Sequence, residues 1–174
     1  NGRDGTFVGP FNLTGGTSNF VASTAQSGAS NEISVTGNAT YIADGASSPN
    51  TGDDTDFGTF SLTGSAVKTF KIFNTGIQDL DITNITENGA DFAITSAPTF
   101  TKTLTPYDSV TFDVTYTSPG TATTSNATVT IGNNDADEAP YTFDITANSV
   151  VVENALDFVG PGAATLHDYV DLGN

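Results

Sequence analysis

Apolar and polar residues alternate in two stretches towards the C-terminal part of the chain, 127–131 and 141–145. In each stretch every second residue is Ala, Val, Ile, Tyr or Phe, and the residues between them are polar. A period of two places alternate side chains on the same face of a strand. Residues 132–140 are rich in Gly, Asn, Asp and Pro, which favour turns and interrupt strand pairing. The pattern predicts a β-hairpin with an acidic connection.

The same kind of alternation recurs through the middle of the chain. Turn-forming Gly, Asn, Asp, Ser and Pro separate the apolar stretches at intervals of about 8–12 residues. The stretches are 33–35, 41–42, 57–62, 70–72, 80–85, 92–94 and 110–116. This spacing predicts an all-β protein, specifically an immunoglobulin-like β-sandwich of about seven short antiparallel strands. The aromatic residues fall mainly at inward strand positions and are expected to form the core.

The charge excludes several kinds of partner. Twenty acidic residues and only four basic ones give a formal net charge of -16. Binding to nucleic acid requires clustered Lys and Arg, so no nucleic-acid partner is expected. An anionic membrane surface is disfavoured for the same reason, and no apolar run approaches the ~20 residues of a membrane helix, so no direct membrane insertion is expected. Solubility of an all-β protein with edge strands is an alternative explanation of the acidity.

Three segments are expected along the chain. Residues 1–30 carry weak strand patterns and are interpreted as an N-terminal segment or the end of a preceding domain. Residues 31–149 form the immunoglobulin-like domain. In residues 150–174 the character changes, and we interpret them as a linker followed by the first strand of another domain.

The central segment resembles the choice-of-anchor D domain, an ASH- and Hydin-related immunoglobulin-like repeat of Bacteroidetes-type secreted proteins. The residues that carry the resemblance are 33–38, 42–46, 56–58, 70–76, 80–82, 91–94, 112–114 and 133–143. Their order and spacing extend over about two thirds of the chain. The resemblance implies an immunoglobulin-like sandwich within a large secreted or cell-surface protein, and it implies no catalytic residues.

The end of the chain is similar to the opening strand of a laminin-G/concanavalin-A-like (LamG) domain. Residues 155–158 and 168–174 carry this similarity. The two resemblances together imply a protein of the kind exported by the type IX secretion system and kept at the surface or released.

The acidic connection is the best candidate for a binding site. Asn133, Asp135, Asp137 and Glu138 supply the hard oxygen ligands that Ca²⁺ prefers, so Ca²⁺ is the one cofactor considered. Asp53, Asp54 and Asp56 form a second acidic group that offers the same kind of oxygen ligands. Neither group has the spacing of an EF-hand loop. The alternative is a solvated loop in which Asn and Asp side chains cap turns.

No catalytic residues are predicted, and the chain is not expected to be an enzyme. It has one histidine, no cysteine and no G-x-S-x-G motif, so neither a nucleophilic triad nor a thiol centre is recognisable. Ser109 fits a short Asp-Ser/Thr-apolar pattern for O-glycosylation, and the alternative there is the start of a strand after a proline.

Three functions are consistent with these patterns. The leading hypothesis is a non-catalytic structural spacer in a secreted or cell-surface multidomain protein of the adhesin type. The alternative is an accessory domain of a secreted hydrolase or carbohydrate-binding protein. A third hypothesis is that an edge strand pairs with a partner strand. The expected partners are surface glycans or proteins of the secretion and assembly machinery.

Overall fold

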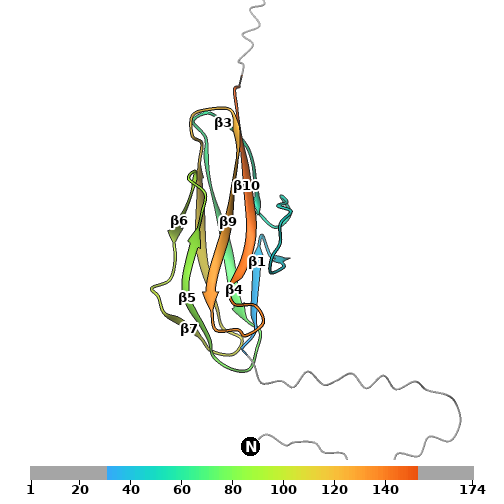
Figure 1. The fold of residues 1–174 in the computed structure, drawn as a ribbon, viewed down its shortest axis with the longest axis vertical. Coiled ribbons are helices and arrows are strands. Elements are labelled where there is room, and N and C mark those ends of the chain that lie inside the picture. Colours follow the sequence, from blue (N-terminus) through green and yellow to red (C-terminus); the bar gives the residue numbers. More distant parts are fainter. Residues whose placement is uncertain (1–30, 153–174) are drawn as a thin grey trace, which may run out of the picture.

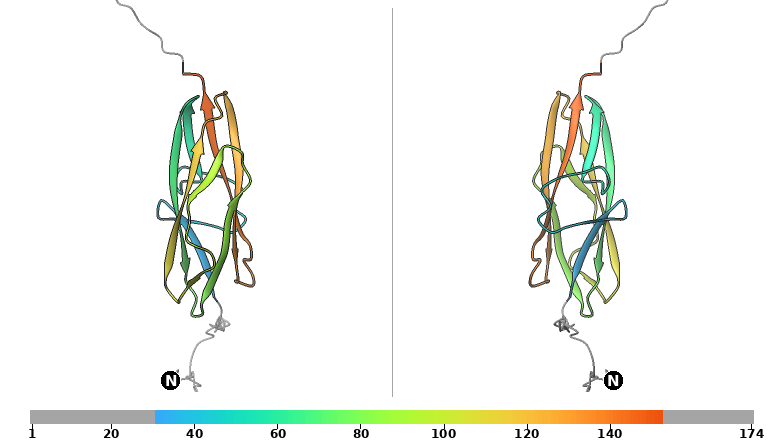
Figure 2. Two further views of the ribbon diagram at one scale, coloured as in Figure 1. Left: turned by 90° about the vertical axis from the view of Figure 1, so that its left-hand side faces the viewer. Right: turned by 90° about the vertical axis from the view of Figure 1, so that its right-hand side faces the viewer.

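Two β-sheets of five strands each pack face to face over residues 31–152, the part of the chain that the computed structural model describes (Figures 1 and 2). The first sheet has the strand order β2-β1-β4-β8-β6 and the second has the order β3-β10-β9-β5-β7. The first contains β1 (Ile33–Gly37), β2 (Thr40–Ile42), β4 (Ser65–Asn74), β6 (Phe92–Ser96) and β8 (Ser109–Thr117). The second contains β3 (Asp56–Ser61), β5 (Leu80–Glu87), β7 (Lys102–Leu104), β9 (Thr123–Asn133) and β10 (Tyr141–Val150).

The predicted hairpin is confirmed as β9 and β10. The two strands pair antiparallel from Tyr141 opposite Ile131 to Ser149 opposite Thr123. Both strands extend beyond the stretches that showed the clearest alternation, because polar Thr, Ser and Asn residues continue the same period of two. The all-β immunoglobulin-like sandwich is therefore confirmed, with its most regular ladder at the expected place.

The number and direction of the strands differ from the prediction. The described residues contain ten strands instead of about seven. β7 matches none of the apolar stretches, because its three residues give almost no periodic signal. The pairing of β3 with β10 is parallel, not antiparallel. Residues 43–55 carry the chain from β2 in the first sheet to β3 in the second, where β3 lies beside β10 (Figure 2).

The crossing segment at residues 43–55 itself bonds to the last strand. The N–H of Gly45 donates to the carbonyl of Thr142, and the N–H of Asp144 donates to the carbonyl of Ala46, both at 2.8 Å. Ala46 thereby forms a parallel bridge opposite Phe143. The outer edge of β10 is thus occupied first by this segment and then by β3.

The core lies between the sheets and is rich in aromatic side chains, as predicted. The rings of Phe70 in β4 and Phe143 in β10 lie 5.2 Å apart across the two sheets, and both side chains are fully buried. Near the other end of the core, Phe57 of β3 meets Phe92 of β6 edge to face at 5.4 Å. Such contacts add to the burial of apolar area that stabilises the sandwich.

The described part of the chain enters and leaves the sandwich at opposite ends. Figure 1 shows β1 starting at the lower end of the long axis, whereas β10 runs upwards and ends at the upper end. Within residues 31–152 no helix is long and apolar enough to cross a bilayer.

Candidate functional site

The connection between β9 and β10 is organised by one side chain, Asn133. Its Oδ1 accepts a hydrogen bond from the N–H of Asp135 at 2.8 Å, which is the usual local bond of an Asn-initiated turn. Its Nδ2 donates to the carbonyl of Ile131 at 3.2 Å and to the carbonyl of Glu138 at 3.1 Å. The amide therefore spans the connection and holds its backbone in shape.

The same connection is tied to both sheets. Asn134 Oδ1 accepts the N–H of Asp81 in β5 at 2.9 Å, and the carbonyl of Asn134 accepts Nδ2 of Asn31 at 2.8 Å. Asp135 Oδ2 accepts the N–H of Ile33, the first residue of β1, at 2.9 Å. These bonds place the connection against the point where the described chain enters the sandwich.

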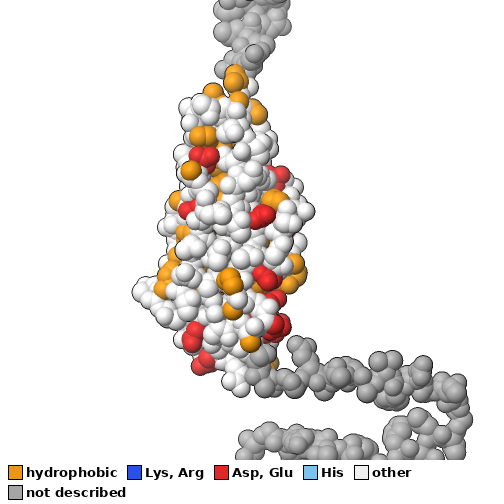
Figure 3. Space-filling view, viewed as in Figure 1, with side chains coloured by type: hydrophobic (Ala, Val, Ile, Leu, Met, Phe, Trp, Pro, Cys, Tyr) orange, Lys and Arg blue, Asp and Glu red, His pale blue; other side chains and the backbone are white. Residues whose placement is uncertain are grey.

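This arrangement brings together four carboxyl groups, Glu32, Asp135, Asp137 and Glu138, which we call the acidic corner. Asp135 is fully buried, Glu32 and Glu138 are partly buried, and Asp137 is exposed. Acidic side chains are visible at this lower end of the molecule in Figure 3. Glu32 joins the corner because its neighbour Ile33 is bonded to Asp135.

Two oxygen atoms of the acidic corner are buried without a hydrogen-bond partner. They are Oδ1 of Asp135 and Oε2 of Glu138. Leaving a buried polar atom unpaired costs roughly 1–3 kcal/mol, and more when the group is charged. In residues 31–152 the one ion pair between side chains joins Lys68 to Asp54, so no basic side chain there compensates the corner.

The charge state of the acidic corner reflects this crowding. Burial, followed by the negative charges of Asp135, Glu32, Asp44 and Asp137, raises the pKa of Glu138 to about 7. Burial and then the same kind of repulsion raise the pKa of Glu32. For Asp135, burial raises the pKa most, and the N–H of Ile33 opposes this by favouring the ionised form. Each shift shows that the corner holds negative charge with too little compensation.

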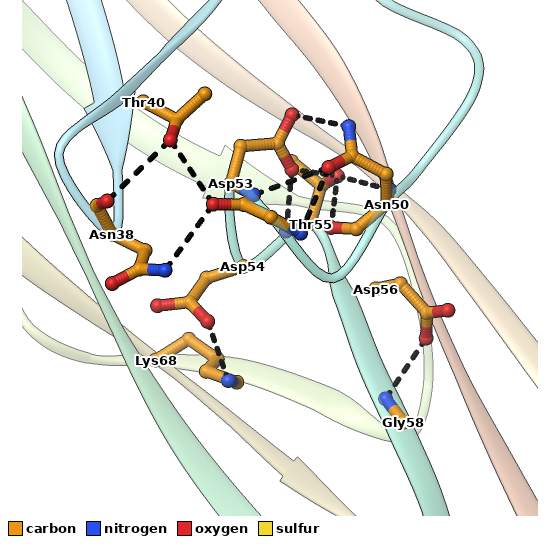
Figure 4. A network of polar contacts seen from close by, with 10 residues as sticks. Asn38, Thr40, Asn50, Asp53, Asp54, Thr55, Asp56, Gly58 and Lys68 are labelled. Atoms are coloured by element: carbon orange, nitrogen blue, oxygen red, sulfur yellow. Dashed lines mark hydrogen bonds and ion pairs between the residues drawn. The ribbon is translucent and has the colours of Figure 1, made fainter.

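The second acidic group is different, as Figure 4 shows. The carboxylate of Asp53 accepts the N–H and hydroxyl of Thr55 at 3.0 and 2.5 Å through Oδ1, and Nδ2 of Asn50 at 2.6 Å through Oδ2. Asp54 pairs with Lys68 at 2.5 Å. The carboxylate of Asp56 accepts the N–H of Gly58 at 2.8 Å. Each of these carboxylates therefore accepts from a donor in or beside the loop before β3.

The structure therefore gives the predicted site residues different roles. Asp135, Asp137 and Glu138 lie in the acidic corner, whereas the amide of Asn133 is engaged in shaping the connection. Glu32 was missed, because about one hundred residues separate it from the connection and no sequence motif links them. Across residues 31–152, no three acidic, His or Cys side chains are already arranged around a common point as a bound metal requires. Calcium binding stays a prediction.

The glycosylation candidate lies in a strand. Ser109 is the first residue of β8, is partly buried, and pairs with Phe73 of β4. Its N–H donates to Oδ1 of Asp108 at 2.8 Å. Modification of Ser109 stays a prediction. The one histidine, His167, lies outside the described residues.

A surface depression of about 320 Å³ lies over β9 and β10 beside the crossing segment. It is lined by small and polar side chains, and Asp144 is the single ionisable residue among them. Oδ1 of Asp144 accepts the hydroxyl of Thr128 at 2.6 Å. The depression therefore does not present the pair of facing carboxyl groups that glycoside hydrolysis uses.

Solved structures resemble this chain at low sequence identity. A protein of unknown function from Porphyromonas gingivalis W83 is 15% identical, with a TM-score of 0.51 over 75% of this chain and 51% of that one. The secreted serine protease VesC from Vibrio cholerae is 17% identical, with a TM-score of 0.44 over 54% of this chain and 21% of that one. The ASH/PapD-like domain 7 of human CEP192 is 10% identical, with a TM-score of 0.44 over 81% of this chain and 100% of that one.

The likeness to the Porphyromonas protein shows the fold alone. The chain spans about a fifth of VesC and about half of the Porphyromonas protein. No curated protein shows a significant sequence match to it. The choice-of-anchor D assignment and the laminin-G-like ending stay predictions, and residues 153–174 lie outside the described range.

A family model does match residues 51–148, more than half of the chain. The chain therefore belongs to the HYDIN/CFA65/VesB-like family of Ig-like domains.

Proposed function

We propose that this domain is a non-catalytic spacer in a larger extracellular multidomain protein. The observation that supports the proposal most directly is the position of the two ends of the described range, residues 31 and 152, which lie at opposite poles of the long axis (Figure 1). A domain with this arrangement adds its full length between its neighbours. A domain whose ends meet at one pole would add much less.

The strand arrangement suits a domain under tension. β1 is held by β4, and β10 is held by β9 on one side and by β3 on the other. Ladder hydrogen bonds run across the strands, so a pull along the strands loads many of them together. A pull that separates two strand ends would instead break the bonds one after another.

Single-molecule stretching tests this proposal. The chain has no cysteine, so two introduced cysteines provide unique attachment points. Attachment at the two ends of the chain is expected to require a much higher unfolding force than attachment at Ile77 and Ala136. Those two residues lie before β5 and after β9, which are neighbouring antiparallel strands, so this second geometry unzips them. Equal forces in the two geometries would contradict the spacer proposal.

An accessory role in a secreted hydrolase is the second candidate. It is supported by the family description, which includes VesB, the name of a Vibrio cholerae protease. The sequence of the complete polypeptide separates the two candidates. A hydrolase domain in the same polypeptide favours the accessory role, and further repeats or a sorting domain favour the spacer.

The finer proposals rest on the resemblance described for the sequence. They are a choice-of-anchor D domain followed by a LamG-like domain, an adhesin-like protein of Bacteroidetes, and export by the type IX system. Surface glycans and proteins of the secretion machinery are the proposed partners. Cell fractionation followed by protease treatment of intact cells tests the extracellular location, and a protein that stays protected inside the cell would contradict it.

A further inference from the structure

The acidic corner has two properties that a solvated acidic loop does not need. Asp135 is 0% exposed and still has one carboxylate oxygen without a donor. Glu138 likewise has a buried oxygen without a partner. A loop evolved only for solubility would leave such groups in water, where hydration satisfies them at no cost. The burial of these two unpaired oxygens therefore points to a missing partner.

The chemistry of the acidic corner limits what that partner can be. The available donor atoms are all oxygens, from Glu32, Asp135, Asp137 and Glu138, and no basic residue of the described chain pairs with them. Hard divalent cations prefer such oxygen ligands, and Ca²⁺ accepts six to eight of them in flexible geometry, with water completing the set. Mg²⁺ demands a stricter octahedron and gives up its water reluctantly.

We propose that the acidic corner binds one Ca²⁺ ion through Oδ1 of Asp135 and Oε2 of Glu138, with Glu32 and Asp137 closing around it. The carboxylates do not yet surround a common point. The exposed Asp137 and the partly buried Glu32 can turn inwards by side-chain rotation. The backbone needs no rearrangement, because Asn133 already holds the connection.

Asn133 is thus a positioning residue in this site and Glu32 is an added ligand. Asp135 has one oxygen on the N–H of Ile33 and the other free for the ion. The ion would therefore join the start of β1, in the first sheet, to the β9–β10 connection of the second sheet. It would stiffen the pole at which the chain enters the sandwich, which is the pole that a spacer presents to its preceding neighbour.

Calorimetric titration of the full 174-residue chain, stripped of metal, tests the site directly. We expect one Ca²⁺ ion per chain with a dissociation constant of about 10⁻⁴–10⁻³ M, the range of extracellular modules. The melting temperature is expected to rise by about 5–10 °C at a hundredfold excess over that constant. An equal rise in NaCl at matched ionic strength would mean charge screening only and would overturn the proposal, as would the absence of both heat and shift.

Neutral variants identify the ligands without removing their volume. Asp135→Asn and Glu138→Gln are each expected to weaken Ca²⁺ binding at least about tenfold. The exposed Asp79, near the same pole but outside the acidic corner, provides the matched control Asp79→Asn, which is expected to bind as the unchanged chain does. In EDTA the two variants should melt at or above the melting temperature of the unchanged chain, because each removes one negative charge from the acidic corner. A variant that binds Ca²⁺ weakly but melts normally in EDTA has lost binding and is not misfolded.

Unchanged affinity in a double variant that combines Asp135→Asn with Glu138→Gln would place the ion elsewhere and overturn the proposal. The calcium site and the spacer function can fail separately. The stretching experiment depends on strand direction and is carried out in EDTA, whereas the titration depends on the acidic corner alone.

Discussion

The phenolic oxygen of Tyr116 and the hydroxyl oxygen of Ser149 lie 2.7 Å apart in the buried space between the sheets. Tyr116 belongs to β8 and Ser149 to β10, so this hydrogen bond connects the two layers. The hydroxyl of Ser118 lies 2.6 Å from that of Ser149 and continues the chain of bonds. Three hydroxyl groups thus join the sheets at the end where the described chain leaves the sandwich, opposite the acidic corner.

Tyr116→Phe removes this connection while keeping the ring. We expect the free energy of unfolding to fall by about 1 kcal/mol, since Ser149 keeps Ser118 as a partner. Urea denaturation followed by tyrosine fluorescence or circular dichroism measures the change. Tyr107→Phe is the control, because Tyr107 is 75% exposed and should tolerate the same change without loss. Equal effects in the two variants would show that the inter-sheet bond contributes nothing.

Gly37→Ala is expected to destabilise the fold through a direct clash. A methyl group on Gly37 would lie 2.0 Å from the backbone carbonyl oxygen of Asp53, in the loop that Figure 4 shows packed over β1. The loop is held by the bonds of Asn50 and Thr55, so it cannot move without breaking them, and we expect a loss of about 3 kcal/mol or more.

Gly45→Ala is the matched control for that clash. Gly45 has a φ of 69° but no atom within 4 Å of an added methyl group. The substitution then costs only the free energy of placing an alanine in the left-handed backbone conformation, about 1–2 kcal/mol. Thermal unfolding of the two variants side by side compares them, and a smaller loss for Gly37→Ala than for Gly45→Ala would refute the steric argument.

Phe143→Ala should leave a cavity at the centre of the core. Phe143 is fully buried and contacts Phe70 of the opposite sheet, so a loss of about 3–5 kcal/mol is expected. Val67 of β4 is 57% exposed, and Val67→Ala should change the stability by no more than about 0.5 kcal/mol. Chemical denaturation measures both, and similar values for the two would contradict the placement of the core.

The stability of the metal-free chain should depend on pH through the ionisation of Glu138. The folded-state pKa of Glu138 is about 7, above its ordinary value of 4.5. Between these values the folded state keeps a proton that the unfolded state has released, so stability falls as the pH rises through this window. Above about 7 the carboxylate is ionised in both states and the loss is complete.

We therefore expect the melting temperature in EDTA to be lower at about pH 8 than at about pH 5.5, and Glu138→Gln to reduce this difference. Asp79→Asn should not reduce it, because Asp79 is exposed and lies outside the acidic corner. A pH profile that is the same in the Glu138→Gln variant and the unchanged chain would assign the effect to the net charge of the whole protein instead.

Much of the fold follows from local patterns. The alternation in β8 and in the β9–β10 hairpin predicted both the strands and the buried face that carries Phe112 and Phe143, because a period of two directly encodes a half-buried strand. The parallel partner of β10 could not be predicted in this way. It depends on where the crossing segment carries the chain, and that is decided by packing between the sheets.

The candidate site, too, could be predicted only in part from the sequence. The sequence identified Asp135 and Glu138 as candidate oxygen ligands and also showed a second acidic group at Asp53 and Asp56. The two groups differ in their partners, and partners such as Thr55 or Ile33 are known only once the chain is folded. Glu32 could not be found at all, since only the packing of β1 beside the connection brings it there.

The crossing segment at residues 43–55 has a consequence for neighbouring domains. With Ala46 and then β3 along its outer side, β10 offers no open edge to another chain. The four strands that do lie at edges are short or irregular. β2 and β7 have three residues each, the pairing of β6 is interrupted by a bulge between Ile94 and Ser96, and the register of β3 against β10 shifts between Thr146 and Asn148. Copies tethered in tandem meet one another at very high local concentration. Because the edge strands of this sandwich are short or irregular, they offer few backbone groups for pairing, and tandem copies can remain separate domains without joining into a shared sheet.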